Sequence, residues 1–300
     1  MINQNPKTLI FIPFFLFVFM ASYAFDPVNL FFLSLQKGKT DTKILVGFKG
    51  GINFTQPIPL ARYSVINTND PEGTGEKKYR SFISNLGYQY GFVMTYNLND
   101  NIAISFQPGI SQYSYNYSNN YSWTDNSNTS NQIDLTYESR HILHYLEFPL
   151  IVQYSYGSGL LKPYLQGGFQ YGMLQNATAK VSTRMIQRSL TGDIPLNMDD
   201  NTGDVSGWYI RSRFTLIAGA GVRYDLNAII LALDASYFFG LNNVVNESGR
   251  YSIQNFSGGS YDIPDDISLH NLVINISLLF PINQTIRRIN DSCKNLLRKR

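Results

Sequence analysis

The sequence predicts an all-β fold, an eight-stranded antiparallel transmembrane β-barrel with short periplasmic turns and long external loops. Three observations support this prediction. Only 15% of the 300 residues are charged, whereas 14% are aromatic. Bulky apolar residues alternate with Gly, Ser, Asn and Gln in segment after segment, which is the period of a strand with two unlike faces. Short and long connections between these segments also alternate along the chain.

The charge and cysteine counts exclude several classes of protein. The formal net charge is +3, and no strand carries a basic stripe, so we expect no nucleic-acid partner. The single cysteine, Cys293, permits neither an internal disulfide nor a CxxC metal site. No cofactor-binding motif is present, because "GAGVRY" lacks the third glycine of a dinucleotide fingerprint. We therefore expect no cofactor and no metal.

The N-terminus predicts export. Lys7 precedes the apolar run "TLIFIPFFLFVFM", and Ser22 and Ala24 supply the small residues of a signal-peptidase site. A membrane anchor is the alternative, but this run is shorter than the roughly 20 residues of a spanning helix. The expected divisions are a signal peptide (1–24), a periplasmic segment (25–42), the barrel (43–280) and a basic C-terminal tail (281–300). For the tail, disorder is favoured slightly over a short amphipathic helix.

Each expected strand has one bulky face and one small polar face. In the first, Ile44, Val46 and Phe48 oppose Lys49 and Gly51. Because almost no Lys or Glu lies on either face, the bulky face is assigned to lipid and the small face to a narrow lumen. Lengths of 11 to 15 residues exceed the roughly 9 to 11 needed to cross a bilayer. The expected strands are 43–54, 82–96, 101–111, 142–156, 161–174, 214–225, 229–239 and 270–280.

The third strand is the least certain in its facing. After Pro108, Tyr113, Tyr115 and Tyr117 take the inward parity, and a β-bulge could return them to the outside. The fourth strand carries Pro149 on its inward face, where the missing backbone donor predicts a bulge or a locally broken hydrogen bond.

The connections predict the orientation of the barrel. The tight turns "NLND", "GSG" and "DLNA" alternate with long links over about 55–81, 112–132, 175–213 and 240–269. Tight periplasmic turns and long external loops are typical of outer-membrane barrels, so we expect the outer membrane of a Gram-negative-type bacterium. Outward aromatic residues at the tight-turn end predict an interfacial girdle. Its members are Tyr96, Tyr154, Tyr156, Tyr224 and Phe280.

Four charged residues take the lumen-facing parity, and we expect them to form a luminal charge network. Unpaired charges in a narrow bore are costly, so Lys49 and Arg223 are predicted to neutralise Glu147 and Asp234. An eight-stranded barrel has a bore that side chains can fill. The network is therefore interpreted as a structural plug, and a proton or ion path is the alternative.

The histidines are the candidates for catalysis. His141 and His144 lie near the external end of the fourth strand, and His270 begins the eighth. Ser139 and Glu138 are close to His141 in sequence, which makes nucleophilic chemistry conceivable. We nevertheless expect no enzyme and no catalytic residue. The double glycines at 50–51 and 167–168 lie in mid-strand, where they predict bends or close packing rather than a phosphate loop.

Three stretches resemble the PorT-like outer-membrane beta-barrel family: "VGFKGGINF", "HYLEFPLIVQY" and "KPYLQGGFQYG". They occur in the family's order, and the resemblance covers roughly 43–280. It implies an outer-membrane location, and one namesake is associated with a protein secretion system. Phe280 looks like the aromatic residue recognised during outer-membrane assembly, although here 20 residues follow it.

These observations lead to one expected function and two alternatives. We expect a non-enzymatic outer-membrane barrel with a structural, surface-binding or secretion-accessory role. The first alternative is a barrel enzyme acting on lipid A or phospholipid, and the second is a soluble periplasmic barrel. Expected partners are outer-membrane lipid, the barrel-assembly machinery, and either an envelope or secretion-complex protein or an extracellular ligand. The loop "SYNYSNNYSWTDNSNTSNQ" is suited to such binding, or is a solvated loop with no partner.

Overall fold

The computed structural model describes residues 44–64, 76–157, 159–189, 192–197, 200–226, 228–250 and 263–282. The predicted signal peptide and periplasmic segment lie outside the described residues, as does the predicted tail from residue 283 onward. Within the described part of the chain, no helix is long and apolar enough to cross a membrane.

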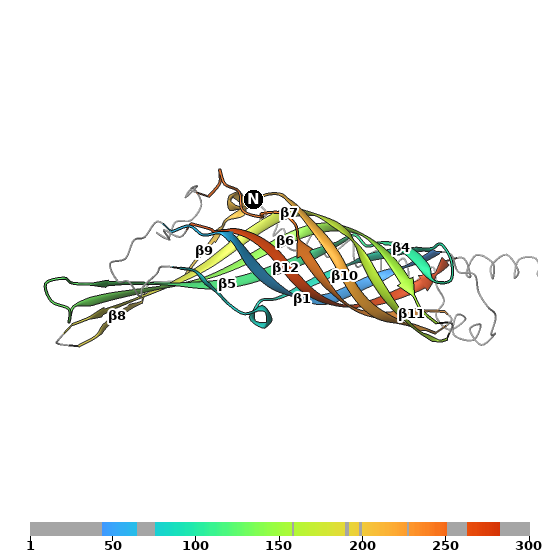
Figure 1. Ribbon diagram of the computed structural model, residues 1–300, viewed down its shortest axis with the longest axis horizontal. Coiled ribbons are helices and arrows are strands. Elements are labelled where there is room, and N and C mark those ends of the chain that lie inside the picture. The colour runs from blue at the N-terminus through green and yellow to red at the C-terminus, as the bar shows by residue number, and fades with distance from the viewer. Residues whose placement is uncertain are drawn as a thin grey trace, which may run out of the picture.

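The described strands form a closed antiparallel barrel (Figure 1). β12 pairs with β1, which closes the ring. β4 and β5 are two halves of one strand position, because their pairing with β3 keeps one register across Gln107 and Pro108. Nine strands therefore fill eight positions, and the predicted fold class is confirmed. The nine are β1 (Ile44–Ala61), β3 (Leu86–Asn97), β4 (Ile102–Phe106), β5 (Gly109–Thr124), β6 (Gln132–Ser155), β7 (Leu161–Arg188), β10 (Ser212–Asp225), β11 (Ile230–Gly240) and β12 (Asp266–Pro281).

An apolar band surrounds the outside of the barrel. Outward side chains such as Leu165 (64% exposed) and Ile276 (58% exposed) have no protein covering them, which is what a lipid-facing surface requires. Outward polar residues first interrupt the band where Gln112 pairs with His144 and where Gln56 pairs with His270. On β1, Ile58 and Leu60 are again exposed beyond Gln56. The predicted assignment of bulky residues to the outside is confirmed. The membrane-spanning parts of the strands lie between this edge and the tight turns.

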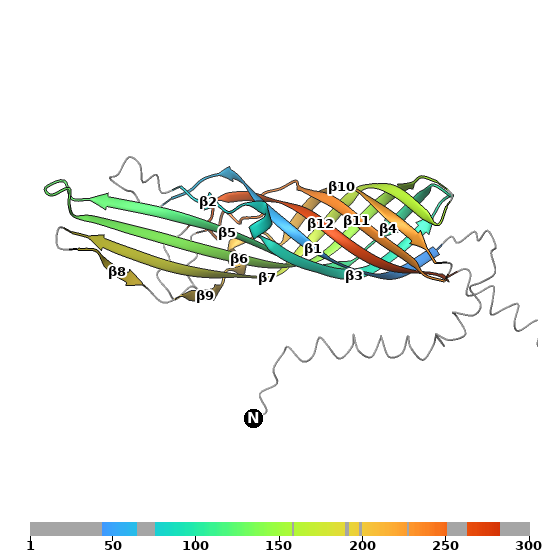
Figure 2. The same ribbon diagram turned by 90° about the horizontal axis from the view of Figure 1, so that it is seen from below.

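Three strands continue far beyond the band and form an external sheet, as Figure 2 shows. β5, β6 and β7 stay paired to their ends, where Thr124 pairs with Gln132 and Gln132 with Arg188. The prediction that 112–132 and 175–213 are mainly loops is therefore wrong. Smaller elements complete the chain: β2 (Lys78–Tyr79), η1 (Phe82–Ser84), β8 (Ile194–Asn197), β9 (Asn201–Asp204) and η2 (Ser206–Trp208).

The tyrosines of β5 explain why the strand continues. Tyr113, Tyr115 and Tyr117 are at most 3% exposed and face the interior, so the suggested bulge that would turn them outward is absent. They join a core cluster with Trp208 and Tyr209 at the junction of the barrel and the external sheet. Burial of these rings stabilises the extended conformation beyond the membrane.

Pro149 does not produce the expected bulge. Its register with Gln170 is continuous, and the shift in the β6–β7 ladder lies instead between His144 and Tyr145. Leu174 and Asn176 are the partners on either side of that shift, so Gln175 is the extra residue. The break between β4 and β5 does lie across from Pro149, because Gln107 N donates to Pro149 O at 3.1 Å and Pro108 cannot donate.

Candidate functional site

Glu147 is the centre of the upper luminal network. It is 4% exposed and accepts hydrogen bonds from Ser111 Oγ (2.5 Å), Tyr113 OH (2.6 Å) and Gln170 Nε2 (2.6 Å). Its charged partner is Arg213, whose Nη1 lies 3.6 Å from Oε1. The Arg213 guanidinium also lies 4.4 Å from the centre of the Tyr113 ring. This carboxylate is buried in a fully formed set of donors.

The predicted partners of Glu147 are therefore wrong. Among the described residues its ion pair is made with Arg213 and not with Lys49 or Arg223. Lys49 Nζ donates to Gln107 Oε1 at 3.1 Å. Arg223 donates to Gln153 Oε1 and lies 5.0 Å from the centre of the Tyr164 ring. Sequence reasoning missed Arg213 because it placed residue 213 at the end of an external loop.

Asp234 is hydrogen-bonded by amides, and the predicted cations Lys49 and Arg223 interact with it electrostatically without a contact ion pair among the described residues. Gln166 Nε2 and Asn275 Nδ2 each donate to its Oδ1 at 3.1 Å. Gly221 leaves room for Tyr164, which lies 3.5 Å from Asp234 Oδ2, since a Cβ at Gly221 would come within 2.5 Å of the tyrosine ring. The lower network is thus one carboxylate held by neutral hydrogen bonds, with Lys49 and Arg223 in its electrostatic surroundings.

A chain of hydrogen bonds joins the two carboxylates. Gln89 Nε2 donates to Asn275 Oδ1 at 2.6 Å, and Ser111 Oγ donates to Glu147 Oε2. Ser111 Oγ also lies 3.5 Å from Gln89 Oε1, which brings the two halves of the chain into contact. At one end of this chain Asn275 donates to Asp234, and at the other end Ser111 donates to Glu147. Side chains from β3, β5, β6, β11 and β12 are therefore bound to one another across the bore, which holds these strands in register.

Apolar layers fill the bore around this network. Ile151, Ile217, Phe238 and Val273 form one buried cluster. A second cluster, made of Leu45, Val93 and Leu279, lies near the tight turns. These inward apolar residues were not predicted, because the inward faces of the strands were described only by their small and polar residues.

The predicted girdle residues all lie on the outer surface near the tight turns. Tyr96, Tyr154, Tyr156 and Tyr224 are 42–72% exposed, and Phe280 is half-buried. Tyr224 on β10 pairs with Leu161 on β7 and with Leu231 on β11, so these three residues lie at the same height on the barrel. Amphipathic rings at this height suit a membrane interface.

His141 lies above the apolar band, inside the core cluster of the external sheet. Its Nε2 is 2.9 Å from Ser139 Oγ and its Nδ1 is 2.6 Å from Tyr209 OH. The ring stacks on Tyr115 with centres 4.9 Å apart. Burial and then the charge of Lys77 lower the pKa of His141 to about 3. The imidazole is therefore neutral at physiological pH.

The other candidate catalytic groups do not gather around His141. Ser139 and His141 are 4% and 1% exposed, whereas Glu138 faces the other side of the sheet and pairs with Arg80 at 3.5 Å. His144 faces outward at the edge of the band, and His270 is 3.3 Å from Tyr237 OH. Among the described residues, no group of three or more His, Cys, Asp or Glu is placed to hold a metal ion.

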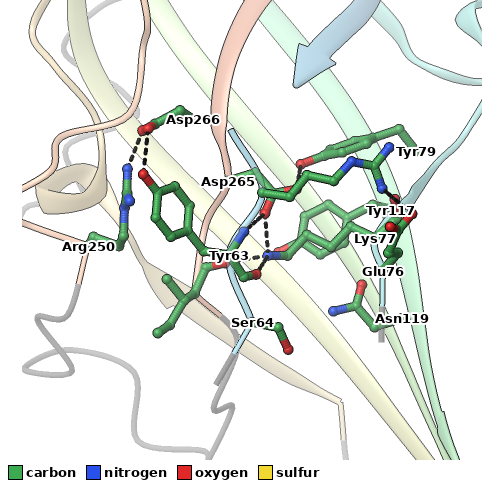
Figure 3. A network of polar contacts seen from close by, with 12 residues as sticks. Tyr63, Ser64, Glu76, Lys77, Tyr79, Tyr117, Asn119, Arg250, Asp265 and Asp266 are labelled. Atoms are coloured by element: carbon green, nitrogen blue, oxygen red, sulfur yellow. Dashed lines mark hydrogen bonds and ion pairs between the residues drawn. The ribbon is translucent and has the colours of Figure 1, made fainter. Parts of the chain in front are cut away.

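Figure 3 shows a second buried ion pair, which closes the external end of the barrel. Lys77 and Asp265 have side chains at most 2% exposed and lie 3.0 Å apart. Tyr79 OH donates to Asp265 Oδ2 at 2.8 Å, and Tyr63 OH donates to Asp266 Oδ2 at 3.1 Å. Arg250 pairs with Asp266 and covers the Tyr63 ring. These contacts join the segment after β1 and the region of β2 to the start of β12 and the chain before it.

The tip of the external sheet exposes apolar side chains on its inner face. In register across β6, β7 and β8, Leu135 pairs with Met185 and Met185 with Leu196. Ile133, Ile194 and Leu196 are 41%, 55% and 45% exposed. We call Ile133, Leu135, Met185, Ile194 and Leu196 the tip patch. It continues the core cluster, against which Leu135 packs.

Comparisons with solved structures found similar barrels at low identity. Ail, the attachment invasion locus protein of Yersinia pestis, is 11% identical over 79% of this chain and 99% of its own, with a TM-score of 0.29. Neisserial surface protein A is 11% identical over 78% of this chain and 95% of its own, with a TM-score of 0.30. A FadL homologue of Pseudomonas aeruginosa is 7% identical over 80% and 90%, with a TM-score of 0.22. No curated protein matches.

A family model described as the outer membrane protein beta-barrel domain matches residues 35–246. That range is more than half of the chain and includes the strands that build the luminal network from β1 to β11. The chain therefore belongs to the outer membrane protein beta-barrel domain family and is a protein of the Gram-negative outer membrane.

Proposed function

We propose that this protein is a non-enzymatic surface-binding protein, in which a plugged barrel holds the external sheet as a recognition surface. The tip patch is the observation that carries this proposal. Leu135, Met185 and Leu196 lie side by side on strands that are paired to their ends, so this apolar row is held in a fixed shape. Ile133 and Ile194 lie in the next row, on either side of Gln187. An exposed apolar surface on an ordered scaffold suits contact with another protein.

The luminal plug supports the same role. A recognition sheet needs a rigid base, and Glu147 with its donors connects β5, β6, β7 and β10 at the level where the sheet leaves the membrane. The partner is proposed to be an extracellular ligand or an envelope protein. The resemblance to the PorT-like family favours a component of a secretion complex among these partners.

Site-specific photo-crosslinking in intact cells tests the proposal. A photoreactive phenylalanine derivative at Leu196 is expected to give an adduct with a partner protein. The matched control is Asn120, which is exposed on the other face of the sheet. Ile133→Ser and Ile194→Ser together are expected to abolish the Leu196 adduct without changing heat-modifiable gel mobility. Equal labelling from Leu196 and Asn120, or no adduct at Leu196, would contradict recognition through the tip patch.

A barrel enzyme acting on lipid A or phospholipid is the second candidate, because Ser139 and His141 lie within hydrogen-bonding distance. Their burial and the position of Glu138 on the other face weigh against it, since a nucleophile must reach its substrate. His141→Gln, His144→Ala and His270→Ala are expected to leave lipid A and phospholipid profiles unchanged. An altered profile in a folded variant would favour the enzyme.

A further inference from the structure

The outward face of the external sheet carries a cluster of basic side chains just above the apolar band. We call Arg80, Arg140, Lys180 and Arg184 the basic cluster. Arg140 on β6 pairs directly with Lys180 on β7, and Arg184 lies four residues further along β7. Arg80 adjoins the same row, because its backbone N donates to the carbonyl oxygen of Asn116, which pairs with Arg140.

The bulge at Gln175 creates this cluster. Below the bulge, the even-numbered residues of β7, such as Gln166 and Gln170, face the lumen and are buried. The extra residue reverses this parity, so Ala177 and Ala179 face the core while Lys180 turns to the outer face. Bulges that re-aim side chains in this way are often functional features rather than defects.

The charges of the cluster are incompletely balanced. Like charges directly opposite each other on neighbouring strands are unfavourable. Lys180 pairs with Asp200 at 2.6 Å and Arg80 with Glu138 at 3.5 Å. Among the described residues no carboxylate pairs with Arg140, whose side chain is exposed. The exposed guanidinium of Arg140 is therefore accessible to an anion from outside the chain.

The height of the cluster indicates which anion is available. On β6 the outward residues above Leu146 are His144, Ile142 and Arg140, and His144 marks the edge of the band. Four residues on a strand tilted by about 40° rise about 10 Å. Arg140 therefore projects over the surrounding bilayer at the level of the outer-leaflet headgroups.

We propose that the basic cluster binds the phosphate groups of anionic lipid headgroups in the outer leaflet. A guanidinium fork and an ammonium group side by side match a phosphate, since Arg binds it bidentately and Lys adds a point charge. Basic clusters at a membrane surface attract anionic lipid in this way. The site is separate from the tip patch, so its occupancy does not depend on a protein partner.

Native mass spectrometry of the full-length protein in detergent micelles tests the site. The probe is bisphosphorylated lipid A, compared with enzymatically dephosphorylated lipid A. The Arg140→Gln/Lys180→Gln variant is expected to weaken binding of the bisphosphorylated lipid by at least about tenfold. Dephosphorylated lipid A is expected to bind the wild-type protein at least about tenfold more weakly than the bisphosphorylated form. Inorganic phosphate in large excess is expected not to displace the lipid.

The matched control removes two charges elsewhere. Arg62 and Arg188 lie in exposed ion pairs with Glu76 and Asp134, and Arg62→Gln/Arg188→Gln is expected to bind bisphosphorylated lipid A within about twofold of wild type. Equal weakening by both double variants would show general electrostatic attraction instead of a site. Displacement by inorganic phosphate, equal binding of the two lipids, or unchanged binding by the Arg140/Lys180 variant would each overturn the proposal.

Discussion

Removal of Arg213 should destabilise the barrel more than any exposed charge does. Arg213→Met keeps much of the side-chain volume and deletes the guanidinium that lies 3.6 Å from Glu147. The carboxylate would then remain buried at 4% exposure without its cation. Breaking a buried pair from one side typically costs about 3–5 kcal/mol. We expect about 3 kcal/mol here, because Ser111, Tyr113 and Gln170 still donate to Glu147.

A double-mutant cycle separates the ion pair from simple loss of packing. Glu147→Gln alone leaves Arg213 buried without its anion, so it should also destabilise. The Glu147→Gln/Arg213→Met variant should be more stable than the sum of the two single losses predicts, with a coupling of about 2 kcal/mol. The assay is urea unfolding in phospholipid vesicles, followed by the fluorescence of the two tryptophans, Trp123 and Trp208, of which Trp208 is 8% exposed in the core cluster.

The control is the same substitution in an exposed pair. Arg188 Nε lies 2.9 Å from Asp134, with side chains 52% and 23% exposed. Arg188→Met is expected to cost at most about 1 kcal/mol, as exposed pairs do. If Arg213→Met lowers the unfolding free energy no more than Arg188→Met, the buried pair is not a major determinant of stability and the reasoning is refuted.

Three further predictions use the same unfolding assay or a companion to it. Because the pKa of His141 is about 3 in the folded protein and 6.5 in the unfolded chain, only the unfolded chain gains this proton as pH falls from 6.5 toward 3. Stability should therefore decrease between pH 6.5 and 3 by about 1.4 kcal/mol per pH unit. His141→Gln should flatten that dependence, and an unchanged slope would argue against it. Lys77→Met should cost about 3 kcal/mol and speed limited proteolysis of the external loops, since Asp265 loses its buried cation. The exposed neighbour Lys78→Met should do neither, and equal protease sensitivity would contradict the buried role. Gly221→Ala should cost about 1–3 kcal/mol, because its Cβ would come within 2.5 Å of a tyrosine ring. Gly50→Ala, which meets nothing within 4 Å, should be neutral, and the reverse order of the two would refute this packing argument.

The face assignment of the strands could be predicted because it depends on a local repeat. Leu146, Phe148 and Leu150 alternate with Glu147 and Pro149, and this alternation places the carboxylate in the lumen whatever the rest of the chain does. The inward parity of Tyr113, Tyr115 and Tyr117 was also visible. The sequence did not reveal that the inward face continues above the membrane, because only the burial of these rings against Trp208 and Tyr209 shows it.

Partners across the bore could not be predicted, because they depend on strand stagger and not on sequence spacing. Lys49 was an attractive partner for Glu147 by charge and approximate height, yet Arg213 from β10 lies closer. The bulge at Gln175 had no sequence signal, and a single extra residue reversed the facing of Lys180.

The amino-acid sequence by itself determined the antiparallel strands, their lipid-facing sides and the tight turns, because each depends on neighbours within a few residues. The tertiary structure decided the ion pairs of Glu147 and Lys77, the length of the external sheet and the position of the basic cluster. These depend on contacts between segments far apart in the sequence, such as Lys77 and Asp265, which are 188 residues apart, and on strand register, which is set by the packing of the whole ring.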